Sequence, residues 1–530
     1  MRRCRHRGDG GGVPGAIGIA RLPSLLAIPH KRGTIRRLPE ERESRMTYRE
    51  AIEYLHSLTD YEKRRLERYT PETLDLTRVE RLLDALGNPH RAYPSVHIAG
   101  TKGKGSTAAM MESALRVAGY RTGFYVSPHL HTFRERIRVG GDLISRKEIV
   151  SLVEEIRPLV KQVEGVTTFE ATTVMAFAHF ARQRVEVLVA EVGLGGRLDA
   201  TNVLMPEAAV ITSLSLDHTY LLGNTLPEIA REKAGIIKAG VPVVSAPQRP
   251  EAIHVIEEVS RERKAPLIEV GRDWTWDAGP FDLKGQFFTA RRIRGGGNDL
   301  AGDYWTPLLG RHQLENGTTA LAALQVLREQ GFNLPRPPVE EGLRTVEWPG
   351  RMEILSQAPL VVADCAHNPY SARVLRTALE EWFPGTRWVL VFGASADKDI
   401  AGMLRALLPI TDYLIVTRSE HPRAISPIEL ADIAASVGGG AEVAVSVSRA
   451  LRRALLATEP GSGLLFTGSI FLVAEARETW AEQNGDPLPD NDRQCSFPCH
   501  SEERSDEGLR FTMTNRQPGT RFSAPLGRSE

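Results

Sequence analysis

One segment constrains this chain more than any other, the stretch HIAGTKGKGST at residues 97–107. An apolar run at 96–99 leads into it and predicts a short buried strand. A helical pattern follows the stretch and reaches a natural stop at Gly119. The apolar face of this expected helix consists of Ala108, Met111, Leu115 and Ala118. A strand, a glycine-rich loop and a helix in this order indicate an α/β fold.

The loop between this strand and helix has the composition of an anion-binding site. Its glycines let backbone N–H groups turn toward an anion, and the helix N-terminus adds partial positive charge. A lysine can reach terminal phosphates, and a hydroxyl can reach a magnesium ion. The candidate nucleotide-binding residues are Gly100, Thr101, Gly103, Lys104, Gly105, Ser106 and Thr107. The alternative is a glycine-rich turn before an ordinary helix, because Gly105 interrupts the usual pattern G-x-x-x-x-G-K-[ST].

Composition narrows the classes of function. The 530 residues carry a formal net charge of +1, with 42% hydrophobic and 25% charged residues, which is ordinary for a soluble globular protein. The balanced charge favours neither a nucleic acid nor a membrane surface as partner, and we find no apolar run long enough to cross a bilayer. The four cysteines are too few for a disulfide framework, so we expect a cytoplasmic protein.

Both ends of the chain differ from its body. Residues 1–45 are rich in Arg, Gly and Pro, follow no period and do not read as a signal peptide. At Met46 an amphipathic helix begins, with Thr47 as its expected cap and Glu50 completing a capping box. We therefore expect 1–45 to be disordered or a mis-assigned start, with a chain that begins at Met46 fully active. The tail at 484–530 is expected to be disordered, and its Cys495 and Cys499 to be a chance pair.

Three apolar runs, at 122–126, 185–190 and 208–213, predict strands of a parallel sheet. Each run is followed by a side chain that can bind a cation: Ser127, Glu191 and His218 respectively. Open α/β sheets bind ligands at the carboxyl ends of their strands, so these residues are candidate ligands. The alternatives are a turn cap at Ser127, an ion pair of Glu191 with Arg197, and a structural histidine.

The remainder of the first half carries three further expectations. The charged segment 134–139 is expected to form a flexible loop over the site. Lys233, in an expected helix at 227–238, reads on its own as a solvated charge. Short alternating stretches at 269–303 predict antiparallel hairpins attached to the main sheet.

A second unit follows a proline-rich segment at 335–338, which reads as a linker. Its expected strands are 360–363, 389–392, 413–417 and 464–467, and helical patterns between them imply a second parallel sheet. The expected domains are therefore 46–337 and 346–483, flanked by the two tails.

Taken together, the ordered segments resemble the bacterial folylpolyglutamate synthase/dihydrofolate synthase branch of the Mur ligase superfamily, over about residues 46–483. The first of these segments, 100–106, has the form G-T-x-G-K-G-[ST] that is found in this branch. The others are 127–129, 191–202, 217–218, 232–235, 312–316, 348–351 and 364–369. The resemblance implies a P-loop Mur-ligase-type central domain and a Rossmann-like C-terminal α/β domain, with ATP between them.

The resemblance also implies roles for single residues. It makes Ser127, Glu191 and His218 magnesium ligands, and Lys233 a carbamylated lysine that holds a second ion. It implies that Asn316 binds the adenine, Arg351 a phosphate and Asp364 the ribose, and that His367 approaches the γ-phosphate. The catalytic set is Lys104, Lys233 and His367. The pterin-side contacts are Thr167, Thr168, Phe169, Glu170, Leu198, Asp199 and Ala200. Two departures are Lys102, where many bacterial members have Asn, and Cys365, where Gly is common.

The activity that the resemblance implies is ATP-dependent ligation. A monomer would add L-glutamate to dihydropteroate, a reduced folylpolyglutamate or both, through an acyl phosphate. One alternative is a Mur-type ligase that acts on a cell-wall precursor. Another is a regulatory module that binds ATP without ligating anything.

Overall fold

The computed structural model describes residues 46–61, 70, 73–294, 299–487 and 491–492. The expectations for residues 1–45 and for the cysteine pair at 495 and 499 lie outside the described residues. The first helix, α1 (Tyr48–Ser57), confirms the expected helix cap, because Thr47 and Glu50 form the capping box.

The central sheet has eight strands in the order β4-β3-β2-β5-β1-β6-β7-β8. Neighbouring strands pair in parallel except at the β4-β3-β2 edge, where β3 is antiparallel to both of its neighbours. Their bounds are β1 (Ser95–Ala99), β2 (Thr122–Tyr125), β3 (Ile137–Val139), β4 (Asp142–Leu143), β5 (Val187–Glu191), β6 (Ala208–Ile211), β7 (Val243–Ser245) and β8 (Leu267–Glu269). The strand that precedes the glycine-rich loop therefore lies inside the sheet, as its apolar sequence predicts.

Alternate residues of the central strands enter different cores. Val187 and Val189 of β5 face one apolar cluster with α3, whereas Leu188 and Ala190 face another with α4 and α5. The helices and 3₁₀ turns of this part are α2 (Leu76–Ala85), η1 (Pro89–Arg91), α3 (Lys104–Val117), η2 (Phe133–Arg136), α4 (Arg146–Val160), α5 (Thr168–Arg182), η3 (Ala200–Val203), α6 (Thr219–Leu222), α7 (Leu226–Ala234), α8 (Pro250–Glu262), α9 (Arg311–Glu329) and α10 (Arg336–Arg344).

The hairpins expected at 269–303 exist, but the expectation that they attach to the main sheet is wrong. Strands β9 (Trp274–Asp282), β10 (Gly285–Arg292) and β11 (Gly302–Thr306) form a separate three-stranded antiparallel sheet. Phe288 and Tyr304 of this sheet belong to the apolar core that also includes α3 and α9. Burial against helices, rather than pairing with a strand edge, holds it in place.

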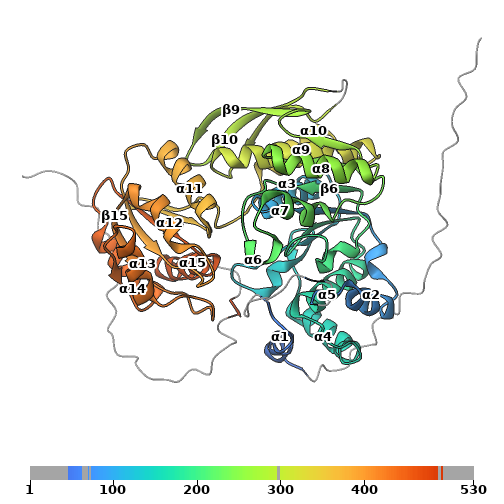
Figure 1. Cartoon of the computed structure of the whole chain (residues 1–530), viewed down its shortest axis with the longest axis horizontal. Coiled ribbons are helices and arrows are strands. Elements are labelled where there is room, and N and C mark those ends of the chain that lie inside the picture. The colour runs from blue at the N-terminus through green and yellow to red at the C-terminus, as the bar shows by residue number, and fades with distance from the viewer. Residues whose placement is uncertain (1–45, 62–69, 71–72, 295–298, 488–490, 493–530) are drawn as a thin grey trace, which may run out of the picture. The chain divides into compact units, whose positions relative to one another are not determined.

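The second sheet has the order β12-β13-β17-β14-β15-β16, and only β12 runs antiparallel. Its strands are β12 (Glu353–Gln357), β13 (Leu360–Asp364), β14 (Trp388–Phe392), β15 (Thr411–Val416), β16 (Glu442–Val443) and β17 (Gly463–Thr467). Its helices are α11 (Pro369–Trp382), α12 (Ile400–Leu407), η4 (Leu408–Ile410), α13 (Pro427–Ser436), α14 (Val447–Ala457) and α15 (Ile470–Asn484). The four expected strands are confirmed, and Figure 1 shows these elements in orange to red.

Two sequence expectations about loops are wrong. Residues 134–139 form η2 and β3, because Glu135 caps the turn and accepts N–H groups from His131 and Thr132. The proline-rich segment at 335–338 begins α10 instead of a linker. Proline is tolerated in the first turn of a helix, and α10 buries Val339 and Leu343 in the core that includes α3.

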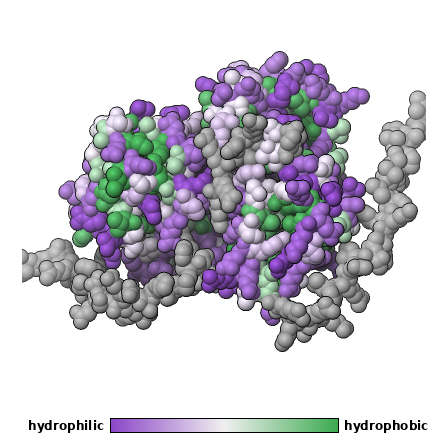
Figure 2. Space-filling model, turned by 60° about the horizontal axis from the view of Figure 1, so that its bottom comes forward, coloured by the Kyte–Doolittle hydropathy of each residue, from purple (hydrophilic) through white to green (hydrophobic). Residues whose placement is uncertain are grey.

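The surface is mixed in character. Figure 2 shows a face on which hydrophilic residues predominate and hydrophobic ones lie in separate patches. Among the described residues, no helix combines the length and the apolar character that a membrane span requires.

Candidate active site

A cavity of about 320 Å³ lies at the carboxyl ends of the central strands and of β13. It collects nearly all of the candidate nucleotide, metal and catalytic residues. Its lining includes Gly100, Thr101, Gly103, Lys104, Gly105, Ser106, Ser127, Glu191, His218, Lys233, Asn316, Arg351, Asp364 and His367. Thr107 is the exception, since it is fully buried in α3 and does not line the cavity.

The loop needs its glycines because other side chains press against it. Gly103 caps α3 with a φ of +86°, in the left-handed region, and Asn316 occupies the space that a Cβ would need. A Cβ at Gly105 would lie 2.7 Å from the ring of Trp348. The sequence around 312–316 and 348–351 therefore packs directly on the loop.

Only part of the loop has N–H groups left for an anion. The N–H groups of Thr101 and Lys102 donate to the Ser213 carbonyl at 3.1 and 3.0 Å, and the Thr101 hydroxyl donates to Ser215. Thr101 therefore anchors the loop to the end of β6. In the first helical turn, the N–H groups of residues 104–106 have no partners inside the helix. These residues line the cavity, so the positive end of the helix dipole is at the cavity.

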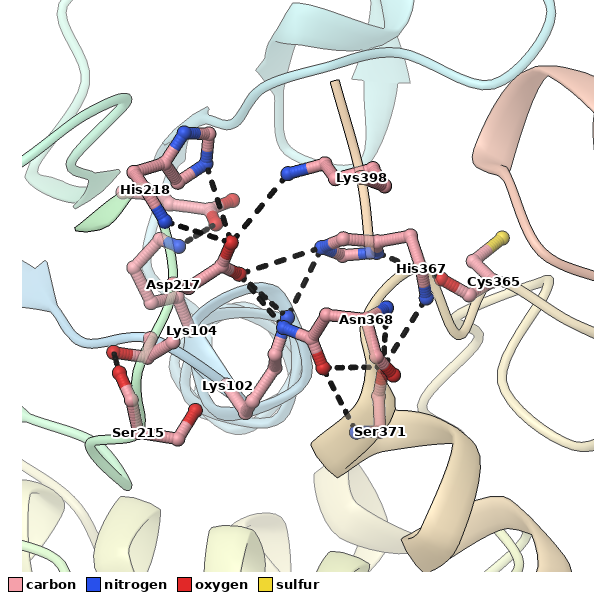
Figure 3. A network of polar contacts seen from close by, with 12 residues as sticks. Lys102, Lys104, Ser215, Asp217, His218, Cys365, His367, Asn368, Ser371 and Lys398 are labelled. Carbon is pink, nitrogen blue, oxygen red and sulfur yellow. Dashed lines mark hydrogen bonds and ion pairs between the residues drawn. The ribbon is translucent and has the colours of Figure 1, made fainter. Parts of the chain in front are cut away.

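Asp217 is the centre of a polar network that sequence reasoning did not assign (Figure 3). Its Oδ2 accepts from Lys102 Nζ at 2.9 Å and from Asn368 at 2.8 Å. Its Oδ1 lies 3.4 Å from Lys398 Nζ and accepts the His218 N–H at 3.0 Å. Burial favours a raised pKa, but Lys102 and Lys398 hold the pKa of Asp217 well below its usual range. In the sequence, the Asp217-His218 pair after a strand was the only sign of this network, and no pattern indicated Lys398.

His367 is held as a neutral ring beside a cation. Its Nδ1 lies 2.9 Å from the Cys365 carbonyl, which can only accept, so Nδ1 carries the proton. Its Nε2 lies 3.0 Å from Lys102 Nζ and accepts from it. The charge of Lys102, with burial, sets the pKa of His367 well below its usual range. At this point of the cavity the positive charge therefore comes from Lys102.

Glu191 is a buried carboxylate at the end of β5. Its nearest cation is Lys104, whose Nζ lies 3.6 Å from Oε1, and burial raises the pKa of Glu191. The alternative ion pair with Arg197 is wrong, because Arg197 pairs with Glu232 at 2.8 Å. Ser127 donates its backbone N–H to the Glu191 carboxylate.

The donor chemistry around Glu191 fits a divalent cation. Ser127 offers a hydroxyl, Glu191 a carboxylate, and His218 an imidazole whose pKa burial and Lys398 lower to about 4, leaving it neutral. Within the described residues, no group of three or more His, Cys, Asp or Glu side chains could hold a metal alone. A magnesium ion here would complete its shell with waters and nucleotide oxygens.

Lys233 is not the solvated charge that its position in α7 suggested. Its side chain is 5% exposed, because this face of α7 packs on the loop around Gly196 and Arg197. Burial and the nearby charge of Lys104 lower the pKa of Lys233 to about 7. A large share of the amine is therefore uncharged at neutral pH.

A second cavity of about 270 Å³ adjoins the first and shares Ser127, His218 and His367 with it. All seven candidate pterin-side residues line it: Thr167, Thr168, Phe169, Glu170, Leu198, Asp199 and Ala200. The Glu170 carboxylate caps α5 and pairs with Arg78 at 2.9 Å, so its charge is already compensated. Phe169 borders the turn between the two cavities, where a Cβ on Gly193 would lie 2.5 Å from its ring.

The C-terminal unit contributes the opposite wall of the first cavity. Asp364, at the end of β13, accepts N–H groups from Met352 and Ala366, both at 2.8 Å, and burial raises its pKa. Arg351 donates to the Gly350 carbonyl at 2.9 Å, and Asn316 donates to Gln313. The three residues expected to hold adenine, phosphate and ribose thus share one cavity with the glycine-rich loop.

Two family descriptions match the chain. Residues 98–324 match "Mur ligase middle domain", and residues 350–470 match "Mur ligase, glutamate ligase domain". The solved structure of E. coli FolC in complex with DHPP and ADP is 30% identical with a TM-score of 0.72. The match covers 84% of this chain and all of that one (100%).

Curated relatives agree. A probable bifunctional folylpolyglutamate synthase/dihydropteroate synthase of Halobacterium salinarum is 38% identical over 84% of this chain, which spans only 54% of that relative. The chain thus spans about half the length of this relative and of its Haloferax volcanii counterpart. The dihydrofolate synthase/folylpolyglutamate synthase of Bacillus subtilis is 34% identical, over 76% of this chain and 94% of the relative. Because both Mur ligase family descriptions match and the Bacillus subtilis relative is covered almost completely, the chain belongs to the folylpolyglutamate synthase/dihydrofolate synthase family of Mur ligases.

Proposed function

We propose that the chain is an ATP-dependent carboxylate–amine ligase that adds L-glutamate to dihydropteroate, to a reduced folylpolyglutamate, or to both. The observation that carries this proposal is the adjacency of two cavities. One contains the glycine-rich loop and the other contains the candidate pterin-side residues, and they share Ser127, His218 and His367. A carboxylate held in the second cavity would face a phosphate held in the first. The names of the relatives, and the ADP and DHPP of the E. coli structure, support the same pair of ligands.

The mechanism follows from the poor reactivity of a carboxylate toward an amine. The first turn of α3 and Lys104 hold the terminal phosphates, and Lys102 offsets charge beside His367. Transfer of the terminal phosphoryl group to the carboxylate gives an acyl phosphate. The amine of L-glutamate then attacks the acyl carbon, and phosphate leaves. Ser127, Glu191 and His218 would hold magnesium, which when bound neutralises charge on the transferring group.

Lys233 fits the role of a carbamylated lysine. Its amine is buried, and its pKa of about 7 leaves uncharged nitrogen available to attack carbon dioxide. The addition of carbon dioxide to the uncharged amine forms one N–C bond, releases one proton and gives an anion with two oxygens. Those oxygens are the type of ligand that a second magnesium ion prefers. Among the described residues Lys233 has no ion pair that would keep it charged.

We propose that the two parts of the chain bind different ligands. Residues 46–337, extended through α10, bind the phosphates and the pterin, and residues 346–483 close the nucleotide cavity from the other side. We also propose that the chain is a cytoplasmic protein, in keeping with its few cysteines, and that it acts as a monomer.

One assay tests the proposed function. Purified protein is given ATP, magnesium and labelled glutamate, with dihydropteroate and tetrahydrofolate offered separately. We expect ADP release and incorporation of label that depend on at least one of the two folates. ADP release that depends on a cell-wall precursor, and not on either folate, would favour the alternative Mur-type ligase. Binding of ATP with no ligation of any acceptor would leave only a regulatory module.

A further inference from the structure

A buried histidine in β1 belongs to neither cavity. His97 is completely buried, and its Nε2 lies 2.7 Å from Thr201 Oγ1 in η3. Its Nδ1 has no hydrogen-bond partner among the described residues. A polar ring at this depth is costly unless it is hydrogen-bonded. Among the described residues, the contact with Thr201 is therefore the only hydrogen bond of the His97 ring.

The direction of the hydrogen bonds beyond Thr201 can be assigned. Asp199 accepts the N–H groups of Leu194 at 2.9 Å and of Thr201 at 3.0 Å, and also accepts the Thr201 hydroxyl. The groups around this carboxylate are donors, so the hydroxyl uses its proton on Asp199 and accepts from His97 Nε2–H. The reverse order would place a proton on Nδ1 and leave a buried N–H without a partner, which proteins avoid. Burial lowers the pKa of His97 to about 3, in agreement with a neutral ring.

The hydrogen bonds run from His97 through Thr201 to Asp199, and they end at the Gly193–Leu194 turn directly after β5. Asp199 holds both of its N–H groups. The turn lines the nucleotide cavity and the second cavity alike. On its other side Phe169 lies so close that a Cβ on Gly193 would meet its ring at 2.5 Å. The turn is therefore fixed between the Asp199 carboxylate and a candidate pterin-side residue.

We propose that His97 is a positioning residue, which acts through Thr201 and Asp199 to fix the Gly193–Leu194 turn and thereby sets the affinity of the second cavity for its pterin-bearing substrate. This inference rests on the proposed function of that cavity. It also gives Asp199 a defined role. Its carboxylate is engaged by its own loop, so it acts on the substrate through the turn.

The test uses two matched pairs of variants in the full chain. Thr201→Val keeps the shape of the side chain but removes the hydroxyl, whereas Thr201→Ser keeps the hydroxyl. His97→Leu removes the ring donor, whereas the amide of His97→Gln can donate from a similar place. The measurements are the dissociation constants of dihydropteroate and of ADP by calorimetry, with the thermal midpoint of each variant.

We expect Thr201→Val and His97→Leu to weaken dihydropteroate binding about tenfold, the size of one lost buried hydrogen bond. ADP binding should change much less, since the glycine-rich loop is anchored separately on Ser213, even though the turn also borders the nucleotide cavity. The Ser and Gln variants should bind dihydropteroate nearly as the parent does. Equal dihydropteroate affinity in the Val variant and the parent would overturn the inference. So would equal losses of both ligands, which indicate a purely structural role. A parent chain that binds ADP but neither dihydropteroate nor tetrahydrofolate would instead refute the proposed function.

Discussion

Replacement of Lys104 by alanine is expected to lower turnover by about 10²- to 10³-fold, the usual cost of removing a group that stabilises developing charge. Lys104 is the first residue of α3 and lines the nucleotide cavity beside N–H groups that have no helical partner. The ion pair of Lys104 with Glu191 is long at 3.6 Å, so its removal should cost the fold little. The measurement is kcat for ligation, with circular dichroism and the thermal midpoint as checks on folding.

Lys147→Ala is the matched control, because Lys147 is exposed on α4 and lies in neither cavity. We expect that variant to keep the parent's turnover. Near-normal turnover in Lys104→Ala, with a folded protein, would remove the assignment of the loop as a phosphate cradle.

Replacement of Lys233 by alanine is expected to abolish ligation, with a loss of about 10²-fold or more if the residue supplies a metal ligand. Short carboxylates such as formate or acetate should restore part of the activity, because they can bring oxygen ligands into the space that the side chain leaves. Lys233→Arg should be inactive and should not be rescued, since a guanidinium stays charged and fills the site. Initial rates with and without added carboxylate give the comparison.

Arg231→Ala serves as the control in the same helix, because Arg231 is exposed and, among the described residues, forms an ion pair with the exposed Glu258. It should ligate normally and show no response to formate. Full activity in Lys233→Ala would leave the carbamate without support. A loss that no carboxylate relieves, accompanied by a lower thermal midpoint, would show that Lys233 serves the packing of α7 instead.

The fold was largely predictable where local pattern and burial agree. The strands at β1, β5, β13 and β14 are short apolar runs, and a run of this kind has few alternatives to a buried parallel strand. Errors arose where local composition and tertiary packing disagree. The charges at 134–139 suggested a loop, yet Glu135 satisfies three backbone N–H groups of its own turn. The prolines at 335, 337 and 338 suggested a linker, yet they occupy the cap and the first turn of α10, where no N–H donor is needed.

The candidate site shows the same division. Residue types at strand ends were enough to place Ser127, Glu191 and His218 at one cavity. The burial of Lys233 could not be predicted from α7 alone, because it depends on the loop that carries Gly196 and Arg197, distant in sequence. The same holds for Lys398, which reaches Asp217 from the other α/β unit. Neither contact leaves a periodic signal in the sequence.

The most direct test of the account is a crystal structure of the protein with magnesium and a non-hydrolysable ATP analogue. We expect the terminal phosphates to lie on the first turn of α3 within reach of Lys104, and a metal ion to contact Glu191. The base should lie toward Asn316 and the ribose toward Asp364. An analogue bound elsewhere, or a loop whose N–H groups face away from the phosphates while Glu191 stays paired with Lys104, would contradict it.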